Sequence, residues 1–300
     1  MIEVNGPVPM KSFISIEHVR ETMDAEKAFE SIRTDIKDGK YDDAKLKVKE
    51  IADGVDNVNT LLKCASLLKV VEDEEGCRDI LRRIAASPIR KEERMNIALS
   101  LRNLGRPDDA YEFMKGEEET DDLLREKART LLLMGEGEEA LSNIERLSSR
   151  TSKDDILLSE ILCSTGEFKK AYEISSRSVK DNRSYDSLVN LCTTLALMGK
   201  SKEAVKTAKQ NLKGEKDADS LALAAYVMRI DGRTAPAVAY AYRALNADHT
   251  HKGALETMAL CFIEKSRFTE AKLLAGGINE KYPGDPAVIR ILDACREASK

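Results

Sequence analysis

The sequence predicts an all-α protein built as a solenoid of about eight stacked helix pairs. Apolar residues recur with the three-and-four spacing of an α-helix, for example in the stretch from Leu255 to Ile278. Most units also carry a glycine five residues before an alanine. The residues at this second position, here called the anchors, follow one another at intervals of 30 to 34 residues, a period typical of helical repeats. The anchors are Ala44, Cys77, Ala110, Ala140, Ala171, Ala204, Ala237 and Ala271.

The glycine and the anchor each have a packing reason. A glycine just past the last apolar residue of a helix can take the left-handed backbone conformation, in which a Cβ is penalised. The anchor then lies one turn into the next helix, where a small side chain lets the two helices of a pair approach closely. For the same reason, we expect a small residue twelve before each anchor. These residues are Ile32, Ala65, Ala98, Ala128, Ser159, Cys192, Ala225 and Ala259.

The chain divides into an N-terminal segment, the repeats and a closing helix. Residues 1–23 precede the repeats and are expected to form an arm or a cap, with Ile16 and Val19 on the inner side of a short helix. The repeats span residues 24–284. The first unit breaks the small-residue rule with Ile32, as a terminal repeat without a preceding neighbour is free to do.

Two irregularities occur along the chain. The second helices of the third and fourth units end early, so we expect a change of curvature around residues 115–155. Residues 285–300 form a single predicted helix with Val288, Ile291, Leu292 and Cys295 on one side. We interpret this helix as a C-terminal cap that covers the apolar face of the last repeat.

This pattern resembles the tetratricopeptide repeat (TPR). The last unit matches the family pattern at Leu255, Met258, Ala259, Phe262, Ala271, Ala275, Ile278 and Pro283. Other units depart from it, because tryptophan is absent and leucine replaces the consensus tyrosine in most of them. The resemblance implies a right-handed α-α superhelical solenoid whose first helices line a concave groove. It also implies a protein that binds other proteins.

Composition limits the function. No apolar run approaches the roughly 20 residues that a spanning helix needs, and the first residues lack the pattern of a secretory signal. A net charge of −5 argues against binding to nucleic acid or to an anionic membrane. Six cysteines fall within predicted helices and form no CxxC pair, so we expect free thiols and a cytoplasmic protein.

Motifs for catalysis or cofactor binding are missing from the sequence. Only three histidines occur, and neither phosphate-binding, dinucleotide-binding, nucleophile-elbow nor HExxH patterns are found. His249 and His251 would hold a metal only if a third ligand converged on them, and their position near a helix start favours a role in the turn. We therefore expect a non-enzymatic protein with no cofactor and no metal.

One known type of TPR site is disfavoured by the residues present. Some TPR domains bind the C-terminal carboxylate of chaperones through Lys and Asn on one unit, Asn on the next, and Lys and Arg on the third. Asn96 and Asn190 occupy the middle slot of this clamp. The units that precede them lack the Lys and Asn pair, since they carry Leu62 with Ser66 and Ile156 with Glu160.

The resemblance places groove-lining residues fifteen, eleven and eight positions before each anchor. These positions predict a groove that is basic near its middle and mostly apolar toward its C-terminal half. The candidate partner-groove residues are Arg102, Arg125, Arg129, Val189, Thr193, Tyr226, Arg229, Leu260 and Ile263.

The preferred function is a protein-protein interaction scaffold that binds a peptide or helix of a partner in its concave groove. Apolar side chains of the partner would contact Val189, Tyr226 and Ile263, and an acidic flank would contact Arg125 and Arg129. One alternative is a regulatory or targeting subunit of an enzyme complex. Another is an RNA-binding helical array, which the negative charge disfavours. The sequence identifies neither the partner nor the oligomeric state.

Overall fold

The computed structural model describes residues 27–36, 38–89, 91–214, 217–282 and 285–298, and every regular element in these ranges is a helix. The predicted N-terminal arm, residues 1–23, lies outside them. Residues 27–36 form the first described helix. The others are α2 (Tyr41–Asp53), α3 (Val58–Val70), α4 (Glu74–Ala86), α5 (Lys91–Asn103), α6 (Pro107–Met114), α7 (Asp121–Met134), α8 (Gly137–Glu145), α9 (Ser152–Ser164), α10 (Phe168–Asp181), α11 (Tyr185–Leu197), α12 (Ser201–Gly214), α13 (Ala218–Ile230), α14 (Thr234–Ala247), α15 (Lys252–Ile263), α16 (Phe268–Lys281) and α17 (Pro286–Ala298).

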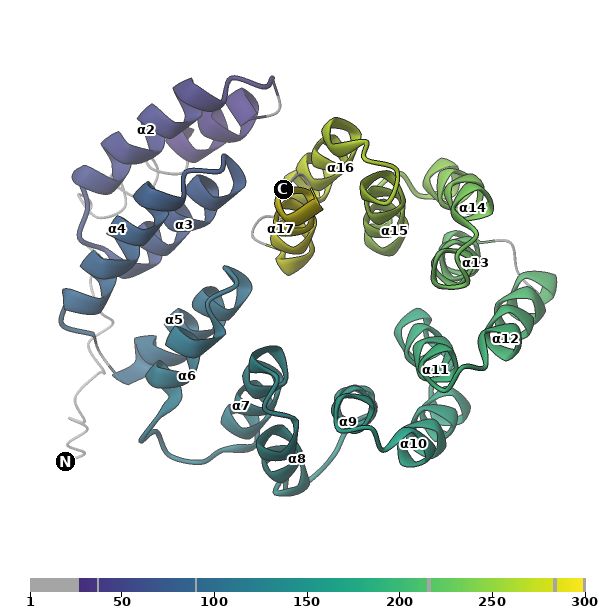
Figure 1. Ribbon diagram of the computed structural model, residues 1–300. Coiled ribbons are helices and arrows are strands. Elements are labelled where there is room, and N and C mark those ends of the chain that lie inside the picture. The colour runs from purple at the N-terminus through teal and green to yellow at the C-terminus, as the bar shows by residue number, and fades with distance from the viewer. Residues whose placement is uncertain (1–26, 37, 90, 215–216, 283–284, 299–300) are drawn as a thin grey trace, which may run out of the picture.

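Consecutive helices pack as pairs, and the pairs follow one another around a ring (Figure 1). The first helix of each pair, from α3 to α15, lies on the inner side of the ring, and the second helix, from α4 to α16, lies on the outer side. Each pair packs on the next, and inner helices of neighbouring pairs also touch, as α11 and α13 do. The predicted all-α solenoid of helix pairs is confirmed.

The predicted register of the pairs is confirmed by backbone conformation and burial. All eight glycine slots have a positive φ, including Glu72 (61°) and Ser266 (56°), the two non-glycine residues of the described chain that adopt this conformation. Their backbone is strained, because a Cβ is disfavoured there. The anchors and the residues twelve before them are almost completely excluded from solvent, with Cys77 the most exposed at 5%.

Side-chain hydrogen bonds show how closely the two helices of a pair cross. The Ser159 hydroxyl donates to the carbonyl of the anchor Ala171 at 3.2 Å, and the Cys192 thiol donates to the carbonyl of the anchor Ala204 at 3.8 Å. A side chain at one position therefore reaches the backbone of the other helix. A larger side chain at either site would have no space.

Two outer helices are much shorter than the rest. The outer helices α10, α12, α14 and α16 have 14 residues each, whereas α6 has 8 and α8 has 9. In the sequence, the apolar pattern of each of these two helices ends early, and this predicts both short helices. The segments after them are longer, and the α8–α9 connection supplies polar groups to the inner helix α7.

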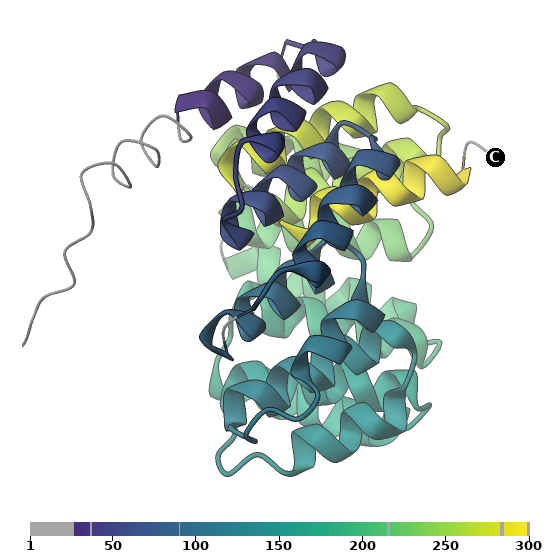
Figure 2. The same cartoon turned by 90° about the vertical axis from the view of Figure 1, so that its left-hand side faces the viewer.

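The last helix closes the ring. Asp285 caps α17 by accepting a hydrogen bond from the Ala287 amide at 2.8 Å. The helix α17 packs on α15 and α16, and it also contacts α3 at the start of the described repeats (Figures 1 and 2). Arg296 pairs with Glu74 at 2.9 Å and Lys69 with Asp293 at 3.5 Å across this seam. Buried residues from both ends form one hydrophobic cluster.

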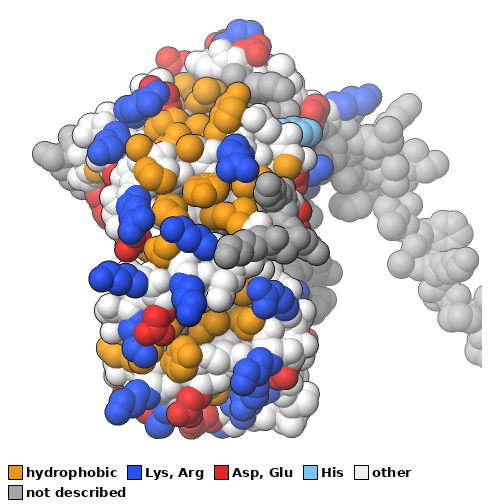
Figure 3. Space-filling view, turned by 90° about the vertical axis from the view of Figure 1, so that its right-hand side faces the viewer, with side chains coloured by type: hydrophobic (Ala, Val, Ile, Leu, Met, Phe, Trp, Pro, Cys, Tyr) orange, Lys and Arg blue, Asp and Glu red, His pale blue; other side chains and the backbone are white. Residues whose placement is uncertain are grey.

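The outer surface differs along the ring. On the side formed by α12 and α14, hydrophobic side chains gather in the upper half of Figure 3 among Lys and Arg side chains. Arg243 is the one charged residue of α14, whose exposed residues include Ala235, Pro236, Ala239 and Tyr242. None of the helices within the described ranges has both the length and the hydropathy needed to cross a membrane.

Candidate partner groove

The inner helices and α17 enclose a hollow of about 860 Å³, here called the central chamber. Its lining comes from α5, α7, α9, α11 and α13 on one side and from α17 on the other. Among the lining residues are Arg102, Arg129, Leu132, Ile156, Glu160, Val189, Asn190, Thr193, Tyr226, Ile289 and Arg290. The concave groove of the repeats is thus partly covered by the chain's own last helix.

The structure brings five of the nine predicted groove residues together. Arg102, Arg129, Val189, Thr193 and Tyr226 all line the central chamber. They come from four different inner helices, α5, α7, α11 and α13. The repeat register alone therefore selects residues that are far apart in the sequence and near in space.

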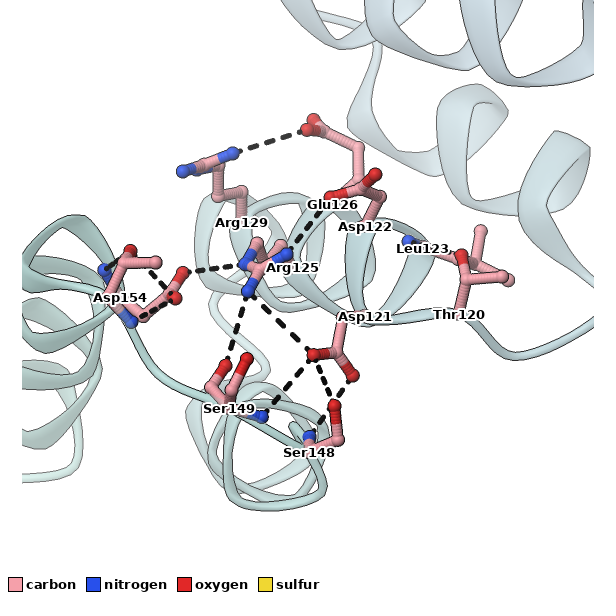
Figure 4. A network of polar contacts seen from close by, with 11 residues as sticks. Thr120, Asp121, Asp122, Leu123, Arg125, Glu126, Arg129, Ser148, Ser149 and Asp154 are labelled. Atoms are coloured by element: carbon pink, nitrogen blue, oxygen red, sulfur yellow. Dashed lines mark hydrogen bonds and ion pairs between the residues drawn. The ribbon is translucent and has the colours of Figure 1, made fainter.

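Arg125 is placed differently, although it lies in the same inner helix as Arg129. Its Nε donates to Asp154 Oδ1 and its Nη1 to Asp122 Oδ1, each at 2.9 Å (Figure 4). Its Nη2 donates to the Ser149 carbonyl at 3.3 Å and lies 3.9 Å from Asp121 Oδ2. The guanidinium joins α7 to the α8–α9 connection and to α9, and it does not line the chamber.

The remaining predicted residues lie against neighbouring parts of the protein. Arg229 pairs with Glu264 at 3.1 Å and stacks over the Tyr226 ring. Ile263 packs against the hydrophobic cluster that includes α17, and Leu260 is half-buried outside the chamber lining. Because α17 covers the concave face of the last repeat, this end of the groove is closed.

Cationic groups on the α5–α7 side of the chamber have acidic partners. Arg102 pairs with the buried Glu126, whose second oxygen lies 3.5 Å from Arg129 Nη1 (Figure 4). From α17, Arg290 pairs with Glu256 at 2.7 Å. The middle of the groove is therefore less positive than its arginine content suggests, and Arg129, which is 37% exposed, is the most available of the inner-helix arginines in the lining.

Glu160 is an acidic group inside the chamber. The surrounding ring of protein desolvates its carboxyl and raises its pKa, and Asp186 adds to this rise, while Arg129 and Arg290 oppose it. The side chain is nevertheless open to the hollow. A cationic or hydrogen-bond-donating group entering the chamber would stabilise its ionised form.

The α11–α13 side of the chamber is apolar with a few hydroxyl and amide groups. Thr193 Oγ1 and the Tyr226 hydroxyl are hydrogen-bonded at 2.6 Å, which fixes the ring against the wall beside Val189. Burial raises the pKa of Tyr226, so this phenol stays neutral. Asn190 Nδ2 donates to the Ile156 carbonyl at 3.5 Å, whereas its buried Oδ1 has no hydrogen-bond partner among the described residues.

The candidate residues taken from the sequence do not include Asn190, Glu160 or any residue of α17. Glu160 nevertheless lies eleven before the anchor Ala171, which is one of the positions that the resemblance assigns to the groove. Asn190 lies fourteen before the anchor Ala204, one residue from such a position. Nothing local in the sequence shows that Ile289 and Arg290 of α17 line the same hollow.

The histidine pair of the α14–α15 connection has a structural use. His251 Nδ1 accepts a hydrogen bond from the Ala254 amide at 3.1 Å and so caps α15, while Nε2 lies 2.9 Å from Asp219 Oδ1 of α13. An accepting Nδ1 places the ring proton on Nε2. No cluster of three or more potential metal ligands occurs within the described residues.

Comparison with known proteins yields similar structures but no family model and no curated protein. One similar structure is a thermophilic TPR protein from Thermus thermophilus, with 21% identity over 58% of this chain and 100% of that one, and a TM-score of 0.45. Another is a TPR protein from Parabacteroides merdae, with 13% identity over 80% and 98% and a TM-score of 0.47. A third is YrrB, a TPR protein with an unusual peptide-binding site, with 14% identity over 58% and 92% and a TM-score of 0.33.

At these identities and scores, the matches say nothing about a ligand of this chain. The fold assignment rests on the chain's own repeats: the positive-φ glycine slots, the buried anchors and the inner and outer helices. By these features the chain is an all-α solenoid of helix pairs that resembles the TPR proteins.

Proposed function

We propose that this protein is a non-enzymatic interaction scaffold that binds a short segment of a partner protein in the central chamber. The observation that supports it is the chamber itself, a hollow of about 860 Å³ that combines apolar walls with a few placed polar groups. This combination is typical of ligand-binding sites in proteins. Six free cysteines support a cytoplasmic location as part of the same proposal.

The size of the chamber limits the segment. A helix with a diameter of 10–12 Å and a rise of 1.5 Å per residue occupies roughly 120–170 Å³ per residue, so the chamber accepts about five to seven residues of helix. A longer partner helix would extend beyond the chamber. The proposal is therefore a helical segment of about two turns, or a peptide of similar volume, with the rest of the partner outside the ring.

The lining indicates the chemistry of the segment. Val189 and the Tyr226 ring offer an apolar contact for one or two anchoring side chains. Arg129 fits an acidic side chain of the partner, and Glu160, which is open to the hollow, fits a hydrogen-bond donor. The proposed contacts exclude Arg125 and Ile263, which the chain itself uses.

Selection from a library of random short peptides tests this proposal. Selected peptides should bind the wild-type protein and should lose about tenfold or more in affinity for Tyr226→Ala, since hot-spot truncations cost about 1 to 2 kcal/mol or more. Tyr226→Phe, which keeps the ring, should retain most of the affinity. Tyr242→Ala removes an exposed tyrosine from the outer surface of α14 and is the matched control.

Arg129→Glu should weaken binding of peptides that carry an acidic residue, and more so at low salt. Circular dichroism and the urea midpoint of each variant check that the solenoid remains folded. Peptides that bind Tyr226→Ala and Arg129→Glu as tightly as the wild type would place the binding site outside the chamber.

A further inference from the structure

The outer side of the ring carries two faces of opposite charge. The acidic face consists of α6 and α8 with their flanking turns, residues 106–119 and 136–146, which contain ten Asp and Glu residues but three Lys and Arg residues. The basic face consists of α10 and α12 with their flanking turns, residues 167–183 and 200–214, which contain ten Lys and Arg residues but four Asp and Glu residues. Charges of each sign are thus concentrated on neighbouring repeats, although the net charge of the whole chain is only −5.

Each face has exposed charges without a hydrogen-bond or ion-pair partner among the residues that the structure describes. On the acidic face these are Asp108, Glu118, Glu136, Glu138 and Glu139. On the basic face they are Lys169, Lys180, Lys202, Lys206 and Lys209. Like charges that gather on one face repel each other, and a surface of opposite charge relieves this repulsion.

The stability of single helices does not explain the basic face. Lys169 and Lys202 lie in the first turns of α10 and α12, where the helix dipole disfavours a cation. Lys206 and Lys209 continue from Lys202 along one side of α12 with spacings of four and three residues, and like charges at such spacings destabilise a helix. A contact with another, negatively charged surface would turn both features into an advantage.

The acidic and basic faces lie side by side, because α10 is the next outer helix after α8 (Figure 1). They meet where the charges of Glu145 in α8 and Lys170 in α10 interact. A two-fold axis passing between α8 and α10 therefore brings the acidic face of one copy against the basic face of another, and it does so twice. A polyanion such as a nucleic acid would be attracted by the basic face alone and repelled by the acidic face beside it.

We propose that two copies of this protein associate about such an axis, with α8 of one copy against α10 of the other and α6 against α12. The proposal concerns the outer side of the ring and does not depend on what the central chamber binds. A second copy is the partner that satisfies the charges of both faces at once.

The area of the two faces sets the expected strength of the dimer. The helices α6, α8, α10 and α12 have 8, 9, 14 and 14 residues. At a rise of 1.5 Å per residue and a width of about 10 Å they cover about 670 Å² on each copy. A flat contact would bury about 1,300 Å² in total, near the lower end of stable interfaces. Because the outer side of a ring is convex, the contact buries less, so the dimer should be weak and should depend on charge.

Sedimentation velocity of the full chain tests the association. At 50 mM NaCl and concentrations up to about 200 μM, the protein should show a reversible monomer–dimer equilibrium. At 500 mM NaCl the dissociation constant should rise at least tenfold, because the screening length falls from about 14 Å to about 4 Å. A monomer at every concentration in 50 mM NaCl would overturn the proposal, and so would a dimer that is insensitive to salt.

Charge reversal tests the assignment of the faces. Glu138→Lys with Glu139→Lys weakens the acidic face, and Lys169→Glu with Lys180→Glu weakens the basic face. Each double variant alone should raise the dissociation constant at least tenfold, since it places like charges opposite each other. An equal mixture of the two variants should regain the dimer, because the reversed charges of one then face the reversed charges of the other.

Asp42→Lys with Asp43→Lys is the matched control. It makes the same change of charge at two adjacent acidic residues in the first turn of α2, which lies elsewhere on the ring (Figure 1). This variant should dimerise like the wild type, and circular dichroism checks that all variants are folded. Failure of the mixture to regain the dimer, or equal losses in the control, would overturn the proposal. Assemblies that grow beyond a dimer would overturn the two-fold arrangement, since a head-to-tail contact does not close.

Discussion

The two sides of the central chamber are held together by different interactions. On the α7–α9 side, Arg125 connects three segments through hydrogen bonds to Asp122, Ser149 and the buried Asp154. On the α11–α13 side, Leu223, Val227 and their neighbours form an apolar cluster, and the polar contribution is limited to bonds such as Thr193 to Tyr226. Both sides contain a cluster of buried apolar residues, and the α7–α9 side adds the ion pair of Arg125 with the buried Asp154.

The lengths of the outer helices account for this difference. The outer helix α8 has 9 residues and α12 has 14, so α8 offers less apolar surface for its neighbours to bury. The connection after α8 instead brings polar groups to α7, since the Asp121 carboxylate accepts from the Ser148 hydroxyl at 2.7 Å and from the Ser148 amide at 3.1 Å (Figure 4). Beside the shortened helix α8, the charged residue Arg125 therefore bonds to residues of its own chain.

The largest expected effect concerns the charged side. Arg125→Ala should cost about 3 kcal/mol, because it leaves the buried Asp154 carboxylate without its cationic partner. The urea midpoint measures the loss. Arg177→Ala is the control, because the ion pair of Arg177 with Asp155 is more exposed: the Arg177 side chain is 53% accessible. Loss of this surface pair should cost less than about 0.5–1 kcal/mol. Equal losses of unfolding free energy in the two variants would show that Arg125 contributes no more to stability than a surface arginine does.

The α11–α13 side and the next inner helix, α15, should be sensitive to side-chain volume. Ala225→Leu and Ala259→Leu should each cost about 1 to 3 kcal/mol, because both alanines are fully buried where two helices cross. Ala239→Leu introduces the same side chain on the exposed surface of α14 and should be nearly neutral. Unchanged midpoints in both buried variants would mean that the helix register is wrong.

The pH dependence of stability should also separate the two sides. Burial alone would raise the pKa of Asp154, but hydrogen bonds from Arg125 and Thr151 outweigh burial and hold this pKa below its ordinary value. A carboxyl with a lowered pKa stabilises the folded state above its unfolded pKa of about 4, and this contribution is lost as the pH falls through the folded pKa. Asp154→Asn should thus be less stable than the wild type at pH 7.

The difference between wild type and Asp154→Asn should shrink below about pH 4. Stability measured against urea at several pH values tests this expectation. A difference that stays constant down to pH 3 would show that the charge of Asp154 contributes nothing.

The smallest effect concerns reactivity. Burial raises the pKa of Cys64, Cys77 and Cys261 to about 11 and that of Cys192 to about 12. At pH 8 roughly one thiol in 1,000 or fewer is then ionised at these sites, so labelling of the native protein should be slow. The half-buried Cys163 should react first. Rapid modification of most thiols without denaturant, or a mass loss that shows disulfides, would contradict both the burial and the proposed compartment.

Much of the fold was predictable because the same contacts between neighbouring helices recur in each repeat. The glycine slots and anchors marked every helix pair, and even Glu72 and Ser266 adopt the backbone conformation that their positions require. In the groove, the same register selected Val189, Thr193 and Tyr226 on the apolar side. These positions depend only on contacts between helices that are neighbours in the sequence.

The sequence by itself thus determined the helix pairs, their register and the inward side of each first helix, since these follow from short-range periodicity and small-residue spacing. Tertiary structure decided the rest. Whether Arg125 faces a partner or Asp154 depends on where the shortened α8 places the following connection. That α17 reaches α3 and lines the chamber depends on curvature summed over all the pairs, to which every interface contributes a small rotation that no single motif encodes.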